Sequence, residues 1–337
     1  MHSRSGPIGY PSIALGAASP VAKAVAVCYP RPMTSILRAG VIGAGVFGGY
    51  HADKYAQLPG VELAAVLDTH PERAEALAGR HGAEAFADLA RFLDVVDVVS
   101  VASPAVAHAA AALSALRAGK AVYVEKPLAT SLQDADAIIT EAAVRDLVIA
   151  CGFLERAAFK VMGLFDIPEQ PRLLEAVRMG PPSPRNLDVS VVIDLMIHDL
   201  DLALALARAE PMTVEAEGAA VANALFDQVE AEVNFDDGFT GLFRASRVAG
   251  QRERTMRLVY PSGEVRIDFL THSFENTTPF TLNPGYDETP AGRDRLGASI
   301  AAFLAAVRGE APGPLAGGLD GARALDLALA VEQAVGR

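Results

Sequence analysis

The sequence predicts an α/β protein of two domains, a doubly wound parallel sheet followed by an α+β domain with a largely antiparallel open sheet. From residue 36 to residue 152, apolar strand-like runs alternate with helical runs, which is typical of a parallel sheet. A glycine-rich turn interrupts the first of these runs. Beyond residue 152, apolar and polar residues alternate with period two between turn signals, which is typical of antiparallel strands.

The composition excludes several classes of protein. The chain has 337 residues, 51% of them hydrophobic and 21% charged, which favours large folded cores over disorder. Its formal net charge is −12 and its basic residues are scattered, so we expect neither nucleic acid nor a membrane surface as a partner. Cys28 and Cys151 are too few for a disulfide framework or a cysteine-based zinc site. We expect a cytoplasmic protein, because no run approaches the roughly 18 apolar residues of a membrane helix.

Residues 1–32 differ in composition from the rest of the chain. They are rich in Gly, Pro, Ser and Ala, and we expect them to lie outside the fold. Pro20 and Lys23 interrupt their only apolar stretch, which argues against a secretion signal. Met33 stands just before the first strand, so a misassigned start is the favoured explanation, ahead of a disordered extension or a cleaved signal. We place the two domains at residues 33–152 and 153–337.

The first domain contains six predicted strands with helices between them. Pro104 is well placed to open the fourth helix, and Gly119 is placed to end it. A further helix is expected over residues 132–143. The strands are expected at residues 36–42, 61–67, 83–86, 97–102, 121–124 and 147–151.

The glycine-rich turn has the spacing of a dinucleotide-binding site, the Rossmann fingerprint. Gly43 permits a tight turn, Gly45 lets the backbone approach a pyrophosphate, and Gly48 lets the next helix pack on the strand. The pyrophosphate then meets free amides at the helix N-terminus. Asp68 stands twenty positions after Gly48, where its carboxylate can bond an adenosine ribose and repel a 2′-phosphate. We therefore expect NAD rather than NADP; the alternative is a turn without a ligand.

The second domain begins with a long helix, expected over residues 192–207. Period-two strands follow at residues 214–221, 229–235, 239–246, 255–260 and 264–269, with hairpin turns at 236–238 and 261–263. The helix can cover one face of this sheet. The other face, expected to bear Val233, Phe235 and Leu242, would stay apolar unless a second copy packs there. We therefore expect a homo-oligomer, a dimer or tetramer formed through this sheet.

Two further motifs point to chemistry. Glu125-Lys126-Pro127 closes the fifth strand, at the carboxyl edge where open parallel sheets bind ligands. The long helix carries Asp194 and His198, four residues apart and so on one face of an α-helix. With the glycine turn and the strand-end run at residues 102–104, these motifs resemble the Gfo/Idh/MocA oxidoreductases. The likeness extends from Met33 to the end of the chain.

The resemblance implies that NAD is the cofactor and that a hydride passes between it and the carbon of a sugar or polyol hydroxyl. In that family a lysine and a histidine handle the hydroxyl proton, and these roles match Lys126 and His198, with Asp194 orienting the imidazole or the substrate. Which of the two takes the proton stays open. Two ligands make no metal site, and the family mechanism needs no metal. The expected cofactor-binding residues are Gly43, Gly45, Val46, Phe47, Gly48, Asp68, Ala102, Ser103, Pro104, His108, Glu125 and Lys126.

Each candidate also has a purely structural interpretation. Lys126 could be a strand-end lysine paired with Glu125, and His198 could be a core histidine. Asp199 and Asp201 are expected to be structural. Arg156 is placed where the family could contact substrate, but a salt bridge is an equal alternative.

The sequence around Asp194 resembles that of the family branch that oxidises nucleotide-linked amino sugars, to which UDP-N-acetylglucosamine 3-dehydrogenases belong. That branch usually reads Glu-Arg-Phe-Asn-Pro at the domain junction, whereas this chain reads Glu-Arg-Ala-Ala-Phe over residues 155–159. Arg185 and Arg247 are candidate donors to a diphosphate. The alternatives are a simple sugar or inositol dehydrogenase of the same family, and a non-catalytic NAD-sensing regulator.

Overall fold

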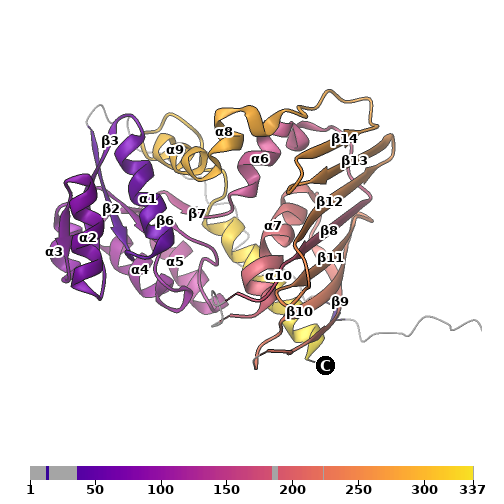
Figure 1. The fold of residues 1–337 in the computed structure, drawn as a ribbon, viewed down its shortest axis with the longest axis horizontal. Helices are drawn as coiled ribbons and strands as arrows, with labels where there is room; N and C mark the ends of the chain where they lie inside the picture. The colour runs from indigo at the N-terminus through magenta and orange to yellow at the C-terminus, as the bar shows by residue number, and fades with distance from the viewer. Residues whose placement is uncertain (1–12, 15–35, 184–188, 223, 337) are drawn as a thin grey trace, which may run out of the picture. The chain divides into compact units, whose positions relative to one another are not determined.

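The computed structural model describes residues 13–14, 36–183, 189–222 and 224–336, which form two compact units (Figure 1). Among the described residues, the first unit contains the chain from residue 36 to Asp166 together with Gly285–Leu325. The second contains Ile167–Pro284, the chain from Asp326 onward and a short strand near the N-terminus, β1 (Ile13–Ala14). The first unit therefore extends past the expected boundary at residue 152 and also takes in a later segment.

The first unit is built on a six-stranded parallel sheet, as predicted. The order β4-β3-β2-β5-β6-β7 reverses direction at β2, which lies between β3 and β5. Open sheets bind ligands beside the carboxyl ends of the strands at such a switch point. The strands are β2 (Leu37–Ile42), β3 (Val61–Leu67), β4 (Glu84–Phe86), β5 (Val98–Val101), β6 (Ala121–Val124) and β7 (Ile149–Cys151).

Crossover helices connect these strands, and the later segment of the chain adds one more helix to their core. Pro104 precedes a short 3₁₀ turn, η2 (Ala105–Ala107), so the α-helix after it begins only at His108. Ile300 and Phe303 of α9 are fully buried, and the Phe303 ring lies 5.9 Å from the ring of Tyr123 on β6. This packing explains why Gly285–Leu325 belongs to the first unit. The helices are α1 (Val46–Gln57), α2 (Pro71–His81), α3 (Leu89–Asp94), α4 (His108–Arg117), α5 (Leu132–Val144), α6 (Glu155–Met162), η3 (Leu164–Asp166), η5 (Tyr286–Glu288), α8 (Pro290–Arg293) and α9 (Arg295–Val307).

The second unit contains an eight-stranded sheet of order β1-β9-β10-β11-β8-β12-β13-β14. Every neighbouring pair is antiparallel except β11 and β8, which are parallel. The five predicted strands are present, and the sequence reading missed β8 and β14. The strands are β8 (Leu173–Met179), β9 (Pro211–Ala219), β10 (Gln228–Phe235), β11 (Thr240–Ser246), β12 (Glu253–Tyr260), β13 (Gly263–Asp268) and β14 (Ser273–Asn276).

The N-terminal extension departs from expectation at one point. Ile13 and Ala14 pair antiparallel with Val214 and Thr213, so β1 extends the sheet beyond β9. An edge strand presents unpaired N–H and C=O groups to any extended segment that reaches it, which is the physical reason for such a contact. The rest of residues 1–32 lies outside the described part of the chain.

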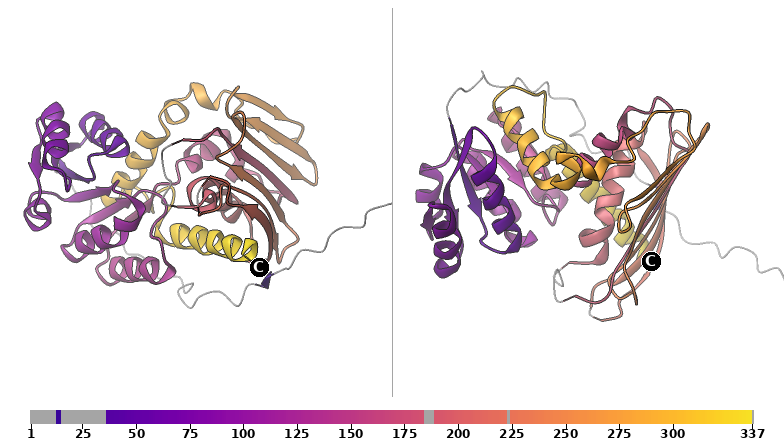
Figure 2. Two further views of the ribbon diagram at one scale, coloured as in Figure 1. Left: turned by 60° about the horizontal axis from the view of Figure 1, so that its bottom comes forward. Right: turned by 45° about the horizontal axis from the view of Figure 1, so that its top comes forward.

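The helices α7 (Ile197–Leu206) and the C-terminal part of α10 (Gly318–Val335) lie on one face of this sheet (Figure 2). Val233 and Phe235 are buried on that covered face, so the expectation that they make the open face apolar is wrong. Apolar and polar residues do alternate along β10 as predicted. However, its apolar side chains face the helices, and its polar side chains, such as Glu230 and Glu232, lie on the open face. Leu242 does lie on the open face, opposite Glu232.

The helix expected over residues 192–207 changes type along its length. Its first turn, η4 (Val192–Met196), is π-helical, and the α-helix α7 begins only at Ile197. Within the described ranges, no helix has both the length and the apolar character required to cross a membrane.

Candidate functional site

The three glycines of the turn after β2 have different surroundings. A Cβ atom on Gly43 would lie 2.7 Å from the backbone N of Ser103, and one on Gly48 would lie 1.7 Å from the carbonyl O of Gly43. Gly43 also has a φ of +100°, which disfavours any other residue. A Cβ on Gly45 would meet nothing within 4 Å. Packing therefore requires the first and third glycines, whereas the second borders open space, as a close ligand needs.

The helix α1 begins directly after this turn, at Val46. Its N-cap, Gly45, has no side chain to bond the first amides, and the first turn contains no acidic residue. Val46 and Phe47 are 52% and 44% exposed. The free amides and the helix dipole fit the pyrophosphate of a dinucleotide.

Asp68 follows β3 and contacts the same turn. Its Oδ2 accepts a hydrogen bond from the backbone N of Ala44 at 2.7 Å, and its Oδ1 accepts one from the N of His70 at 2.8 Å. Burial alone would raise the pKa of this carboxyl, but the hydrogen bonds outweigh it and the pKa is lowered. Asp68 is therefore a carboxylate fixed beside the glycine turn.

The loop after β5 carries Ser103, Pro104 and His108. The Ser103 hydroxyl is buried and has no hydrogen-bond partner in the parts of the chain described here. His108 is buried at 2% exposure, with Nδ1 2.7 Å from the carbonyl O of Pro127 and Nε2 2.9 Å from that of Ser103. Its ring thus ties this loop to the segment after β6, and both of its nitrogens are engaged with the backbone.

Glu125 and Lys126 follow β6 at the carboxyl edge of the sheet, and a cis peptide bond joins Lys126 to Pro127. Glu125 is 7% exposed, and its Oε1 lies 2.8 Å from Nε2 of His51 on α1. The sequence reading missed His51. The signal that could have located it is its position three residues after Gly48, on the helix that follows the glycine turn.

Asp194 and His198 lie in η4 and α7 respectively. Asp194 is 9% exposed and His198 is half-buried. Their spacing of four crosses the change from π-helix to α-helix, so the expectation that they share a regular α-helical face does not apply as stated. Single π-turns occur frequently at functional sites, where they redirect side chains.

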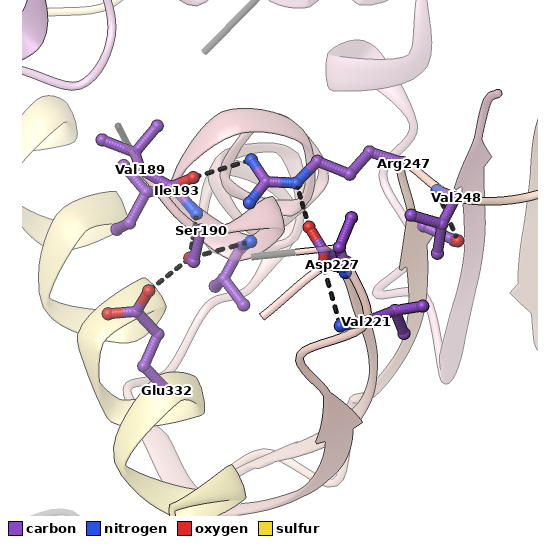
Figure 3. Close-up of polar contacts among 11 residues, drawn as sticks. Val189, Ser190, Ile193, Val221, Asp227, Arg247, Val248 and Glu332 are labelled. Atoms are coloured by element: carbon purple, nitrogen blue, oxygen red, sulfur yellow. Dashed lines mark hydrogen bonds and ion pairs between the residues drawn. The ribbon is translucent and has the colours of Figure 1, made fainter. Parts of the chain in front are cut away.

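Two buried contacts hold the segment that leads into η4 (Figure 3). The Arg247 guanidinium donates to Oδ1 of Asp227 at 2.7 Å and to the carbonyl O of Val189 at 2.7 Å. On the other side, the Ser190 hydroxyl bonds Glu332 of α10 and accepts from the backbone N of Val192 at 3.2 Å. The start of η4 is thus fixed by strand β11's end and by α10.

The candidate substrate-binding arginines are engaged inside the protein. Arg247 is 7% exposed in its pair with Asp227. Arg156 is 9% exposed and donates to Oδ1 of Asp320 at 3.0 Å and to the carbonyl O of Leu315 at 3.2 Å. These contacts support the salt-bridge interpretation of Arg156. Arg185 lies outside the described residues.

Asp199 is structural, as expected, because Arg178 donates to both of its oxygens at 3.0 and 2.7 Å. Asp201 is also buried, at 1% exposure. Among the described side chains, no group of three or more His, Cys, Asp or Glu is arranged to hold a metal ion. Of the expected catalytic residues, Lys126 belongs to the first unit, and Asp194 and His198 belong to the second.

Comparison with known proteins identifies the family. Residues 37–153 match the model of the oxidoreductase family with an NAD-binding Rossmann fold, and residues 177–266 match the GFO/IDH/MocA C-terminal domain. The chain belongs to the GFO/IDH/MocA oxidoreductases. It is therefore an oxidoreductase with an NAD-binding domain, as the sequence motifs predicted.

Individual relatives refine this placement. The chain is 38% identical over 309 residues to UDP-N-acetylglucosamine 3-dehydrogenase of Acidithiobacillus ferrooxidans, covering 89% of this chain and 97% of the relative. The solved structure of that enzyme matches with a TM-score of 0.83 at 37% identity, covering 90% of this chain and 98% of the other. The WlbA dehydrogenase from Bordetella pertussis, solved with NADH and UDP-GlcNAcA, shares the fold at 19% identity with a TM-score of 0.81, covering 90% and 96%. Myo-inositol 2-dehydrogenase of Thermotoga maritima is 26% identical over 237 residues, covering 64% and 69%.

Proposed function

We propose that the protein is an NAD-dependent dehydrogenase of a nucleotide-linked amino sugar, with UDP-N-acetylglucosamine as the substrate and C3 as the carbon oxidised. The observation that carries this proposal is the 38% identity, over nearly the whole length of both chains, to a UDP-N-acetylglucosamine 3-dehydrogenase. The presence of Lys126, Asp194 and His198 supports catalysis over a purely regulatory role, because a regulator has no need of acid–base groups.

The turn after β2 and the start of α1 would hold the cofactor. The open space beside Gly45 and the uncapped amides of α1 fit a pyrophosphate, and the fixed carboxylate of Asp68 fits a ribose diol. A 2′-phosphate would meet the negative charge of Asp68, so we expect NAD to bind better than NADP. When bound, NAD supplies the hydride acceptor at C4 of its nicotinamide.

Oxidation of the sugar hydroxyl requires removal of a hydride from carbon and of a proton from oxygen. The hydride, with its electron pair, would pass to the nicotinamide of an NAD held by the glycine turn and Asp68, and the products would be a ketone and NADH. We assign the proton to the Lys126 and His198 pair, since an unperturbed histidine titrates at about 6.5 and suits neutral pH. Asp194 orients the imidazole or the substrate. Each of these groups acts by position, so the test of the assignment is a loss of turnover rather than of cofactor binding.

The simple polyol alternative has one observation in its favour. Arg156 and Arg247, the described arginines considered for a diphosphate, are held in buried pairs with Asp320 and Asp227. A free hexose or inositol needs no such donors. We therefore keep a sugar or inositol dehydrogenase of the same family as the second candidate.

The deciding experiment measures NADH formation at 340 nm with NAD and UDP-N-acetylglucosamine, free N-acetylglucosamine, or myo-inositol. A ketone trap is included because alcohol oxidation by NAD is uphill at neutral pH. We expect turnover with the nucleotide sugar and far less with the free sugar, since binding energy from the nucleotide positions the ring hydroxyl. Activity on inositol or a free hexose alone supports the second candidate. Inactivity on every sugar, with NAD still bound, indicates a regulator.

A further inference from the structure

Four buried polar side chains form a continuous hydrogen-bonded chain behind Lys126. Tyr55 and His51 come from α1, Ser100 from β5 and Glu125 from the end of β6. The Tyr55 hydroxyl lies 2.7 Å from Oγ of Ser100, which lies 2.9 Å from Nδ1 of His51, and Nε2 of His51 lies 2.8 Å from Oε1 of Glu125. Tyr55, His51 and Ser100 are each fully buried.

The carboxylate at one end fixes the donor of the link that it makes. Burial would raise the pKa of Glu125, but hydrogen bonding and charge interaction with His51 outweigh it and the pKa is lowered, so Glu125 is a carboxylate and only accepts. His51 must then donate from Nε2. On the other side of the ring, the Ser100 hydroxyl bonds Nδ1 and the Tyr55 hydroxyl, whose pKa is raised by burial.

The hydrogen-bonded series ends at a buried tyrosine, which excludes a role in carrying protons to water. Because Tyr55 is fully buried, protons cannot pass along these groups to water. A closed, fully satisfied polar chain instead fixes the groups at its ends. The Glu125 carboxylate is also confined from the side of β7, where a Cβ on Gly152 would lie 2.7 Å from its Oε2.

We propose that His51 is a positioning residue for the dehydrogenase reaction, holding Glu125 against the backbone that presents Lys126 and tying it to α1. Helix α1 also carries the amides expected to meet the pyrophosphate. The His51 imidazole would therefore fix both the segment that carries Lys126 and the helix that binds the cofactor. This inference rests on the proposed role of Lys126.

Other titratable groups surround the pair and bear on its pH dependence. They are Tyr55 on α1, Tyr123 on β6, Lys126 after β6, Cys151 on β7 and His108 on α4. Loss of the His51 hydrogen bond removes the main influence that keeps Glu125 charged. Lys126 then loses a neighbouring negative charge.

Two substitutions at His51 separate positioning from simple packing. Asn places an amide near Nδ1 and keeps the Ser100 contact, whereas Gln reaches the Nε2 position and keeps the bond to Glu125. We expect His51→Asn to lower kcat by about tenfold to a hundredfold and to move the pH profile of kcat toward lower pH. His51→Gln should keep kcat within about threefold of wild type and leave the profile in place. His81→Asn, on α2, is the matched control and should leave kcat unchanged.

Two measurements do not depend on turnover. In the cofactor-free protein, ¹⁵N NMR of the imidazoles should show a proton held on Nε2 of His51 at pH 7, because the Glu125 carboxylate accepts from it. Calorimetric titration should show an NAD Kd for His51→Gln within about threefold of wild type, and a weaker one for His51→Asn, since α1 loses its brace. An Nε2 without a proton at pH 7, equal losses in the Asn and Gln variants, or a wild-type pH profile in His51→Asn each overturns the inference.

If His51→Asn does not fold, Glu125→Gln carries the test, because it removes the charge at nearly constant volume. It should reproduce the shift in the pH profile, and a wild-type profile overturns the inference. Lys126→Met is measured alongside. Full activity of Lys126→Met rejects the proposed function itself, whereas an inactive Lys126→Met with a wild-type profile in His51→Asn or Glu125→Gln rejects only the role of His51.

Discussion

Asp68 links the glycine turn to the end of β3, because its two oxygens accept hydrogen bonds from Ala44 and His70. Removing the carboxylate therefore alters both the charge where the ribose is expected to bind and the support of the turn. We expect Asp68→Ala to weaken NAD binding about tenfold and to reduce the preference for NAD over NADP. Calorimetric titration with both dinucleotides measures this.

Asp97→Asn provides the matched control, since Asp97 pairs with Arg38 at the opposite end of β2. It should leave both affinities unchanged. Equal or tighter binding of NADP to the wild-type protein would contradict the role given to Asp68.

Lys126 and His198 should each be needed for turnover. Positioned acid–base groups contribute about 10²–10⁴ in rate, so we expect Lys126→Met and His198→Ala to lower kcat at least about a hundredfold. The NAD Kd should change much less in His198→Ala, because His198 belongs to the second unit. Steady-state kinetics and NAD titration separate the two effects.

Lys120→Met tests whether loss of any lysine near β6 has the same effect. The ammonium of Lys120 donates to the carbonyl O of Val96 at 2.8 Å, before the strand begins. The Lys120→Met variant should retain wild-type kcat. Near wild-type turnover in both Lys126→Met and His198→Ala would refute the proton path.

At the scale of elements, Asp227 joins the β9–β10 connection to Arg247 at the end of β11. Its Oδ2 accepts from the backbone N of Val221 at 2.8 Å, and Arg247 bonds Oδ1. Breaking a buried pair leaves a charge without its partner, so Asp227→Asn should lower the free energy of unfolding by about 3 kcal/mol. Urea unfolding at pH 7 measures this against Glu230→Gln, whose exposed pair with Arg244 should contribute less than about 1 kcal/mol.

The same carboxylate predicts a pH dependence. Burial would raise the pKa of Asp227, but its backbone and Arg247 hydrogen bonds lower it to about 2, against about 3.9 in an unfolded chain. A depressed folded pKa contributes stability that is present above pH 4 or so and lost as the pH falls toward 2. The difference in stability between wild type and Asp227→Asn should therefore shrink between pH 5 and pH 3; a constant difference would contradict the assignment.

The elements that the sequence predicted are those with a local signal. The strands of the first sheet are continuous apolar runs between turns, because both faces are covered by helices. β8 lacks such a signal: adjacent Leu173 and Leu174 break its alternation, and its parallel pairing with β11 joins segments far apart in the chain. The π-turn at η4 was missed because helix type depends on the hydrogen bonds of Ser190 and its neighbours, which composition does not encode.

The site was predictable to the extent that it depends on motifs. The glycine spacing, Asp68 and Lys126 could be located because the carboxyl ends of parallel strands meet at one edge. The engagement of Arg156 with Asp320 and of His51 with Glu125 could not, since each pair joins residues distant in sequence. Tertiary contacts of this kind decide whether a charged side chain serves a ligand or the fold.

At the scale of the whole molecule, the open face of the eight-stranded sheet remains the candidate surface for self-association. It forms a hollow of about 780 Å³ with Leu242 among its lining residues. Acidic side chains, including Glu217 and Glu230, lie on β9 and β10, whereas Arg257 and Arg266 lie on β12 and β13, where they form ion pairs with Glu175 and Glu264. The face is thus charged rather than apolar.

This charge distribution selects one way of pairing two copies. A two-fold axis parallel to the strands reverses their order, so β9 and β10 of one copy face β12 and β13 of the other, where Arg257 and Arg266 can exchange their pairs with Glu175 and Glu264 for pairs with the acidic strands of the second copy. An axis perpendicular to the strands would place the acidic strands on each other, which like-charge repulsion disfavours. We therefore expect a dimer that weakens as ionic strength rises from 0.05 to 0.5 M or so, because salt screens these pairs.

Arg266→Glu should weaken this dimer about tenfold or more, since it adds a like charge to the surface facing the acidic strands. Arg117→Glu makes the same charge change on exposed α4 of the first unit and should leave the dimer intact. Combining Arg266→Glu with Glu217→Arg should restore part of the association, because the exchanged charges again oppose each other across the two-fold axis. Sedimentation velocity over a range of protein and salt concentrations measures all three. A wild-type protein that sediments as a monomer at tens of micromolar and low salt would remove this face as a self-association surface, and its charges would then serve only to keep the exposed sheet soluble.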